Sequence, residues 1–115
     1  MVKVLTDSTY KTIDNDRIAI VKVHAKWCGP CKLLKPRYKK WEKKFNLYNG
    51  EKVKYYEIDG DKNKKFKKEF NIDRYPTTLF FIYGILVFTQ YGATRESVHE
   101  NLLKETLKIK YERTE

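Results

Sequence analysis

A nearly continuous apolar run leads directly into the only two cysteines of the sequence, and this combination restricts the fold more than any other feature. The run, Ile18 to Ala25, is interrupted by Lys22, and it is typical of a strand buried on both faces. Cys28 and Cys31 follow it, with Pro30 between them. Proline is tolerated in the first turn of a helix, where its missing N–H would have no partner anyway. The sequence therefore predicts a central strand followed by a helix that has both cysteines at its N-terminus.

This position favours thiolate chemistry at Cys28. Unpaired backbone N–H groups and the helix dipole stabilise negative charge at a helix N-terminus. The pKa of a cysteine, near 8.5 in a free peptide, falls to between about 3.5 and 7.5 in such a Cys-x-x-Cys pair. Cys31, one turn further on, is placed to attack a mixed disulfide formed by Cys28. A bridge between cysteines so close in sequence constrains the unfolded chain little, so redox chemistry and metal binding remain the two interpretations.

The length and the charge of the chain limit the class of protein. At 115 residues the chain is long enough for one core without disulfide staples, so we expect a single domain at 1–110 and a polar tail at 111–115. The formal net charge is +10, but only five of the 25 basic residues are arginines. Arginine is the side chain suited to bidentate contacts with phosphates and bases, so nucleic acid is disfavoured as a partner. A lysine-rich surface that steers an acidic partner remains open.

The sequence also indicates where the protein works. It has neither a basic-then-apolar leader nor an apolar run of membrane-spanning length, which predicts neither secretion nor membrane insertion. Two cysteines that make a poor structural staple fit a reducing setting. We therefore expect a cytoplasmic protein with no membrane partner.

Strands and helices alternate along the sequence in the order βα, βα, βα, ββ, α. Predicted strands span 2–5, 18–25, 53–58, 77–83 and 85–91, and the last two meet at a Tyr83-Gly84 turn. Four helices are predicted. The first is short and capped by Asp7 or Ser8, the second runs from Cys31 to about Leu47 and is ended by Asn49-Gly50, and the third runs from Asp61 to Phe70. The last is capped by Thr94 and has an apolar stripe of Val98, Leu102, Leu103, Leu107 and Ile109. Crossovers between parallel strands are right-handed, so the early strands form a parallel core and the hairpin adds antiparallel edges. The predicted class is α/β, with a central mixed sheet flanked by helices.

The residues resemble the thioredoxin family in three places. These are the hexapeptide Trp27-Cys28-Gly29-Pro30-Cys31-Lys32 after the buried strand, Tyr75-Pro76-Thr77 before the hairpin, and Gly92 before the final helix. The likeness runs from about Val2 to Ile109, and it implies the thioredoxin fold and a thiol-disulfide oxidoreductase that reduces protein disulfides. It also implies that Cys28 is the nucleophile, that Cys31 is the resolving cysteine, and that the two form a redox disulfide.

The resemblance assigns a substrate-binding surface as well. It implies a cis bond before Pro76, next to the cysteines, and a backbone contact between Tyr75 and an extended substrate. Trp27, Gly29, Pro30 and Gly92 complete this surface by the same resemblance. The sequence has no flavin or nicotinamide fingerprint, so we expect no bound cofactor and a separate reductase that uses flavin and NADPH.

Lys22 is the main departure from the family, which typically has a buried aspartate at this position. A buried, charged lysine stabilises nearby thiolate, and this makes a dithiol pair more oxidising. Alternatively, the side chain of Lys22 reaches solvent and has no redox role. If alternate residues of 53–57 share one strand face, Glu57 or the Tyr55 hydroxyl meets Lys22.

The two histidines raise further alternatives. His24 lies where the family often has an aromatic residue, and it either tunes the thiolate or is an ordinary strand residue. His24, His99 and the two cysteines have the right chemistry for zinc, but His99 is expected to pack far from the cysteines. We therefore expect no metal.

Two other functions stay open at this point. The chain is either a binding module with a basic surface and dispensable cysteines, or a more oxidising disulfide oxidase or isomerase. The potential, not the motif, sets the direction of thiol-disulfide exchange.

Overall fold

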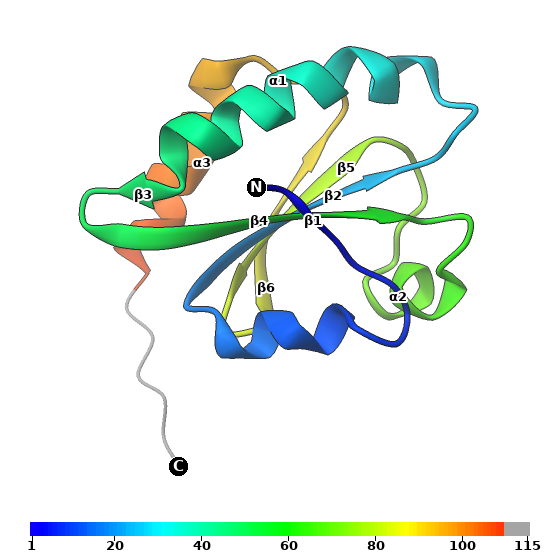
Figure 1. Ribbon diagram of the computed structural model, residues 1–115, viewed down its shortest axis with the longest axis horizontal. Coiled ribbons are helices and arrows are strands. Elements are labelled where there is room, and N and C mark those ends of the chain that lie inside the picture. Colours follow the sequence, from blue (N-terminus) through cyan, green and yellow to red (C-terminus); the bar gives the residue numbers. More distant parts are fainter. Residues whose placement is uncertain (110–115) are drawn as a thin grey trace.

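A computed structural model of the chain describes residues 1–109, and it is organised around one mixed sheet (Figure 1). The strand order is β1 (Lys3–Val4), β4 (Glu51–Asp59), β2 (Ile18–His24), β5 (Thr77–Ile82) and β6 (Ile85–Tyr91). β4 pairs in parallel with β1 and β2, whereas β5 is antiparallel to both β2 and β6. The predicted parallel core with an antiparallel hairpin is therefore confirmed. The tail predicted at 111–115 lies outside the described residues.

Helices cover both faces of the sheet. Figure 1 shows α1 (Gly29–Phe45) and α3 (Glu96–Lys108) on one side, and the short 3₁₀ helix η1 (Tyr10–Asn15) and α2 (Lys64–Glu69) on the other. Successive side chains of a strand point to opposite faces. Ala19, Val21 and Val23 of β2 accordingly join the core under η1 and α2. Ile18 and Ile20 join the core under α1 and α3, so β2 is buried on both faces as predicted.

The register of β2 and β4 shows which residues lie on the α1-facing side of the sheet, from its middle to the end near the cysteines. Ile18 lies opposite Val53, and Ile20 lies opposite Tyr55. Two residues further along both strands, Lys22 lies opposite Glu57. After two more residues, His24 lies opposite Asp59. The face of the sheet under α1 is therefore apolar in its middle and polar at the end where the helix begins.

Two turns use residues with positive φ. Tyr83 and Gly84 (φ 47° and 78°) join β5 to β6 as predicted, and a Cβ on Gly84 would lie 2.0 Å from Oδ1 of Asp14. The prediction for Asn49-Gly50 was wrong, because α1 already ends at Phe45. Asn49 and Gly50 (φ 51° and 81°) instead turn the chain between β4 and a two-residue strand, β3 (Leu47–Tyr48), which pairs with it. A short polar turn of this kind suits a hairpin as well as a helix end.

The predicted stripe of the last helix packs against the core except for Val98, and two polar residues are buried with it. Val98 is 38% exposed, whereas His99, Leu103 and Thr106 are buried. Each of the two buried polar residues has a partner, because the Thr106 hydroxyl donates to the Leu102 carbonyl and the His99 ring bonds the Tyr55 hydroxyl. Apolar residues alone therefore do not mark the buried stripe.

The predicted helix caps were also wrong. The last helix follows Arg95, and no side chain caps it, so Thr94 lies outside the capping position. Asp7 does not cap η1 either, because its carboxylate accepts the N–H groups of Lys65 (3.1 Å) and Phe66 (2.9 Å) in the first turn of α2. A side chain from the N-terminal segment thus satisfies the N-terminus of a helix far away in the sequence.

Replacing Asp7 with alanine is expected to destabilise the fold by about 1 kcal/mol, since two N–H groups of α2 would lose their acceptor. The free energy of unfolding, from urea titration, measures the loss. Asp73→Ala is the matched control, because Asp73 is largely exposed. Within residues 1–109, its side chain has polar contacts only with the neighbouring Arg74. Equal stability of the two variants would contradict the capping role of Asp7.

Candidate dithiol active site

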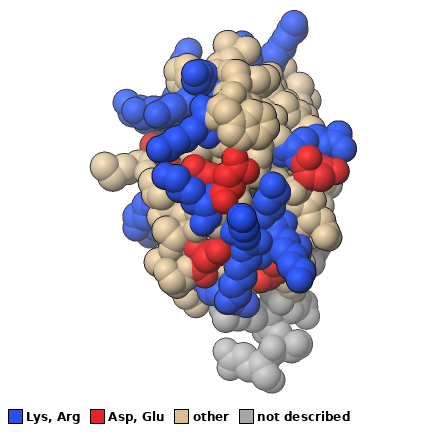
Figure 2. Space-filling view, turned by 90° about the vertical axis from the view of Figure 1, so that its right-hand side faces the viewer, with Lys and Arg blue, Asp and Glu red and all other residues tan. Residues whose placement is uncertain are grey.

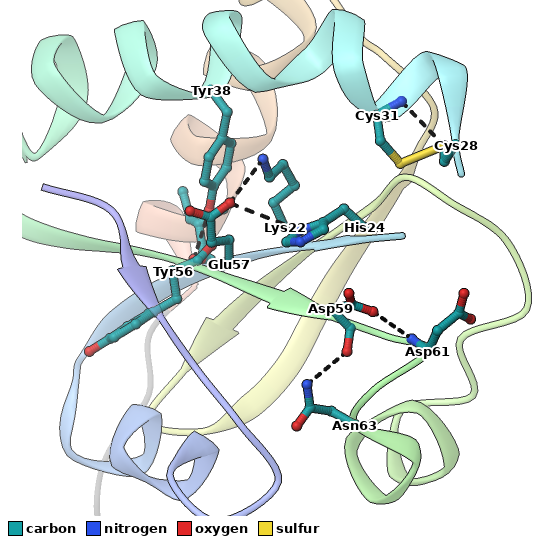
Figure 3. A network of polar contacts seen from close by, with 11 residues as sticks. Lys22, His24, Cys28, Cys31, Tyr38, Tyr56, Glu57, Asp59, Asp61 and Asn63 are labelled. Atoms are coloured by element: carbon teal, nitrogen blue, oxygen red, sulfur yellow. Dashed lines mark hydrogen bonds and ion pairs between the residues drawn. A yellow bond between two sulfur atoms is a disulfide. The ribbon is translucent and has the colours of Figure 1, made fainter. Parts of the chain in front are cut away.

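The two cysteines meet at the start of α1, as predicted. Cys28 is the N-cap of α1, Gly29 is its first residue and Pro30 lies in its first turn. The Sγ atom of Cys28 accepts a hydrogen bond from the backbone N–H of Cys31 (3.2 Å). A disulfide joins the two sulfurs, with 5.3 Å between the Cα atoms (Figure 3). The pair therefore has the backbone donors of a helix N-terminus directed at Cys28.

The start of β5 lies against this disulfide. The Tyr75–Pro76 peptide bond is cis, as the resemblance implied, and the Tyr75 side chain packs against Ala25 and both cysteines. The Pro76 carbonyl accepts the N–H of Gly92 (2.9 Å), a residue with φ of 83°. The structure thus joins the segments around Pro76 and Gly92 next to the two cysteines.

Trp27 forms an exposed rim beside the disulfide. Its side chain is 72% exposed, and its indole N–H donates to Oδ2 of Asp61 (2.6 Å). The other oxygen of Asp61 accepts the hydroxyl of Tyr75 (2.9 Å), and the rings of Trp27 and Tyr75 meet edge to face. These two hydrogen bonds, from Trp27 first and then Tyr75, lower the pKa of Asp61. One carboxylate therefore holds two aromatic rings in place at the site.

Two residues of this rim were missed by sequence reasoning. Asp61 looks like an ordinary first residue of a helix, and Gly60 looks like part of a turn. A Cβ on Gly60 would lie 2.6 Å from ring atoms of Tyr75, so only glycine leaves room for that ring. The available signal was their position directly after β4, because side chains from the carboxyl ends of parallel strands gather at one edge.

Lys22 lies under α1, on a pocket that Cys31 also lines, and forms an ion pair with Glu57 (Figure 3). It is 2% exposed, so the alternative in which its side chain reaches solvent is wrong. Its Nζ lies 3.3 Å from Oε1 of Glu57 and 5.2 Å from the centre of the Tyr38 ring. The predicted pairing with Glu57 is therefore confirmed, whereas the Tyr55 hydroxyl bonds His99 instead. Burial lowers the pKa of Lys22, and the charge of Glu57 opposes this shift.

The two histidines occupy separate environments. His24 lines a pocket of about 340 Å³ that it shares with Lys22, Cys31 and Glu57. His99 instead stacks on Trp41 in the core, where burial lowers its pKa to about 4. Within residues 1–109, no group of three or more His, Cys, Asp or Glu side chains is arranged to hold a metal ion.

A disulfide at a helix N-terminus, with the residue before a cis-proline packed against it, defines a thiol-disulfide exchange protein. The family model for thioredoxin matches residues 1–106. Thioredoxin from Borreliella burgdorferi is 32% identical over 90 residues, which cover 78% of this chain and 74% of that protein. Thioredoxin from Oryctolagus cuniculus is 33% identical over 87 residues, or 76% and 78% of the two chains. A solved structure of Plasmodium falciparum thioredoxin matches with a TM-score of 0.79 at 28% identity, covering 90% of this chain and 98% of that one.

The chain therefore belongs to the thioredoxin family. It has the thioredoxin fold, and it is a protein-disulfide reductase that works by thiol-disulfide exchange. Membership implies that it acts on disulfide substrates and receives electrons from a reductase. Among the described residues, none of the helices combines the length and the apolar character needed to cross a membrane.

The hydrogen bond between Trp27 and Asp61 predicts a specific pH response. The indole N–H signal of Trp27 in NMR spectra should shift as Asp61 is protonated, and the lowered pKa of Asp61 places this shift below the pH at which a free aspartate titrates. A Trp27 signal that titrates at the ordinary aspartate pH would contradict the contact, and Asp61→Asn should abolish the response.

Proposed function

We propose that Cys28 is the nucleophile of this reductase and that Cys31 resolves the mixed disulfide. In the first step the Cys28 thiolate attacks a substrate disulfide, and one substrate sulfur leaves as a thiolate. In the second step Cys31 loses its proton and attacks the Cys28 sulfur, so the reduced substrate leaves and the Cys28–Cys31 disulfide forms. The observation that carries this assignment is the N-cap position of Cys28, where its sulfur accepts the N–H of Cys31. Such a position stabilises the thiolate that attacks.

We propose that substrates dock on the surface next to this pair. The exposed ring of Trp27 provides contact area, and exposed aromatic rings are favoured at binding surfaces. Tyr75 offers its backbone, next to Pro76, to an extended substrate chain. Gly29 and Pro30 are exposed at the start of α1, and Gly29 has no atoms within 4 Å of the position a Cβ would take. Gly92 completes this surface around the two cysteines, whose own exposed fractions are 2% for Cys28 and 5% for Cys31.

We also propose that docking partners carry acidic surfaces. Figure 2 looks onto the end of the sheet at which β2 and β4 finish, and Lys and Arg side chains cover much of that face, with Asp and Glu between them. The exposed lysines near this end belong to the loop before α1, to α1, and to α2 with the loop that leads into it: Lys26, Lys32, Lys35, Lys62, Lys64, Lys65 and Lys68. A field of this sign raises the encounter rate with acidic proteins, and the scarcity of arginine argues against nucleic acid.

The remaining proposals concern the setting of the reaction. The electron donor is a flavin- and NADPH-dependent reductase, since the chain has no dinucleotide fingerprint of its own. The compartment is the cytoplasm, where reducing conditions keep the dithiol available. Residues 1–110 act as one thioredoxin-like domain. Both cysteines are used in the redox pair, which leaves none for a structural disulfide.

Serine variants test the two cysteine roles. Cys31→Ser should form stable mixed disulfides at Cys28 with substrates and reductase in a cell extract, because nothing resolves them. Cys28→Ser should lose disulfide reductase activity and form no such adducts. Mass spectrometry of adducts, with the Cys28→Ser/Cys31→Ser double variant as control, measures both. Adducts of Cys31→Ser at the level of the double variant would contradict the proposal, and full biological function of the double variant would favour a binding module.

Lys22 is proposed to make the dithiol less reducing than one with an aspartate beneath it. Its charge stabilises thiolate and hence the reduced form, although Glu57 at 3.3 Å offsets part of this field. Lys22→Asp should therefore lower the reduction potential, by about 30 mV if the couple shifts tenfold. Lys39→Asp makes the same charge change at an exposed position of α1, and solvent screening should leave its potential close to that of the wild type. Equal potentials for wild type and Lys22→Asp would contradict a redox role for Lys22.

A further inference from the structure

His24 has an unusual buried nitrogen. Within residues 1–109, its Nδ1 is the one buried side-chain N or O atom that has no hydrogen-bond partner. Oε1 of Glu57 lies 3.9 Å from it, which is too long for a hydrogen bond. This nitrogen therefore has no protein partner, and it is open to a water molecule or to a proton.

The position of His24 connects this nitrogen to the dithiol. His24 is the last residue of β2 and lies on the same side of the sheet as Lys22, facing α1 (Figure 3). It lines the pocket of about 340 Å³ to which Cys31 also contributes. A water molecule occupies about 30 Å³ in the liquid, so this pocket has room for a short water bridge between Cys31 and His24.

We propose that His24 accepts, through this pocket, the proton that Cys31 releases when it resolves the mixed disulfide, and that Glu57 is the positioning residue that stabilises the imidazolium. The inference rests on the proposed roles of Cys28 and Cys31. The Cys31 proton moves to Nδ1 of His24, and the Cys31 sulfur forms a bond to the Cys28 sulfur. The bond between Cys28 and the substrate sulfur breaks, and its electron pair leaves with the substrate thiolate. The imidazolium then releases its proton to solvent, to which the His24 side chain is 26% exposed.

The charges around the pocket suit this role. Glu57 and Asp59 of β4 favour the protonated ring, whereas Lys22 of β2 and Lys35 of α1 oppose it. Lys26 and Lys32 also line the pocket. Burial first, and then Lys22, lower the pKa of His24, so its ring is neutral near pH 7 and able to accept a proton. Glu57 is already paired with Lys22, and Asp59 accepts the N–H groups of Asp61 and Lys62. The Nδ1 atom of His24 is thus the buried acceptor on this pocket that has no hydrogen bond.

Reaction of the reduced protein with the aromatic disulfide DTNB separates the two steps. Attack by Cys28 releases one coloured thiolate, and resolution by Cys31 releases a second, so stopped-flow absorbance records both phases in one trace. His24→Gln should slow the second phase at pH 7 by about tenfold or more and leave the first phase within about twofold, because only the second uses the acceptor. His24→Phe should give the same loss with an aromatic ring in place.

The pH profile of the second phase tests Glu57. Glu57→Gln should move its inflection to lower pH, because the carboxylate favours the protonated ring and its removal lowers the pKa of His24. Both His24 variants should lose this inflection. A second phase that His24→Gln leaves unchanged, or equal slowing of both phases, would overturn the inference. Release of only one equivalent of coloured thiolate by the wild type would instead overturn the proposed cysteine roles, so the two failures are distinct.

NMR titration of the two histidines gives an independent readout. Reduction places thiol and thiolate sulfur next to the pocket, so the pKa of His24 should rise relative to that in the oxidised protein. His99, stacked on Trp41 in the core, is the internal control and should titrate identically in both redox states. Identical His24 titrations in the two states would also overturn the inference.

Discussion

The burial of β2 on both faces is the constraint on which the rest of the structure depends. Its alternate side chains enter two separate cores, one under α1 and α3 and the other under η1 and α2. A strand covered in this way must lie in the middle of the sheet, with β4 on one side and β5 on the other. The chain that leaves its end enters α1 directly, and β5 begins beside the same end. The dithiol and the cis-proline therefore meet because both follow from the position of one strand.

The same strand also brings charge beneath the site. The side that carries Ile18 and Ile20 continues with Lys22, which is almost fully buried and paired with Glu57 from β4. Burying an ion pair removes both charges from water, and the attraction between them offsets only part of this cost. Such a pair is therefore weak evidence for stability. The pair shares a pocket with Cys31 and the unpaired nitrogen of His24, and this placement supports the proposed control of charge and protons during exchange.

The sequence predicted the features that depend on local pattern and failed where partners come from distant segments. The buried strand, the N-terminal position of the cysteines and the Tyr83-Gly84 turn were all predicted correctly, since each rests on adjacent residues. Asp7 was assigned to the wrong helix, because a capping side chain is chosen by proximity in space and α2 begins 57 residues further on. The small strand β3 was missed for a similar reason, as two residues carry too little pattern to be recognised without their partner strand.

The sequence by itself thus determined the order of the elements, the central strand and the chemistry of the cysteine pair. Periodicity and motif spacing are local properties of the chain, and they suffice for these conclusions. Only the tertiary structure decided what surrounds the dithiol: that Lys22 pairs with Glu57 and not with Tyr55, that Asp61 holds the rings of Trp27 and Tyr75, and that His24 keeps one nitrogen unpaired. These are matters of register and of which strand ends lie side by side, and they are fixed only when distant segments pack together.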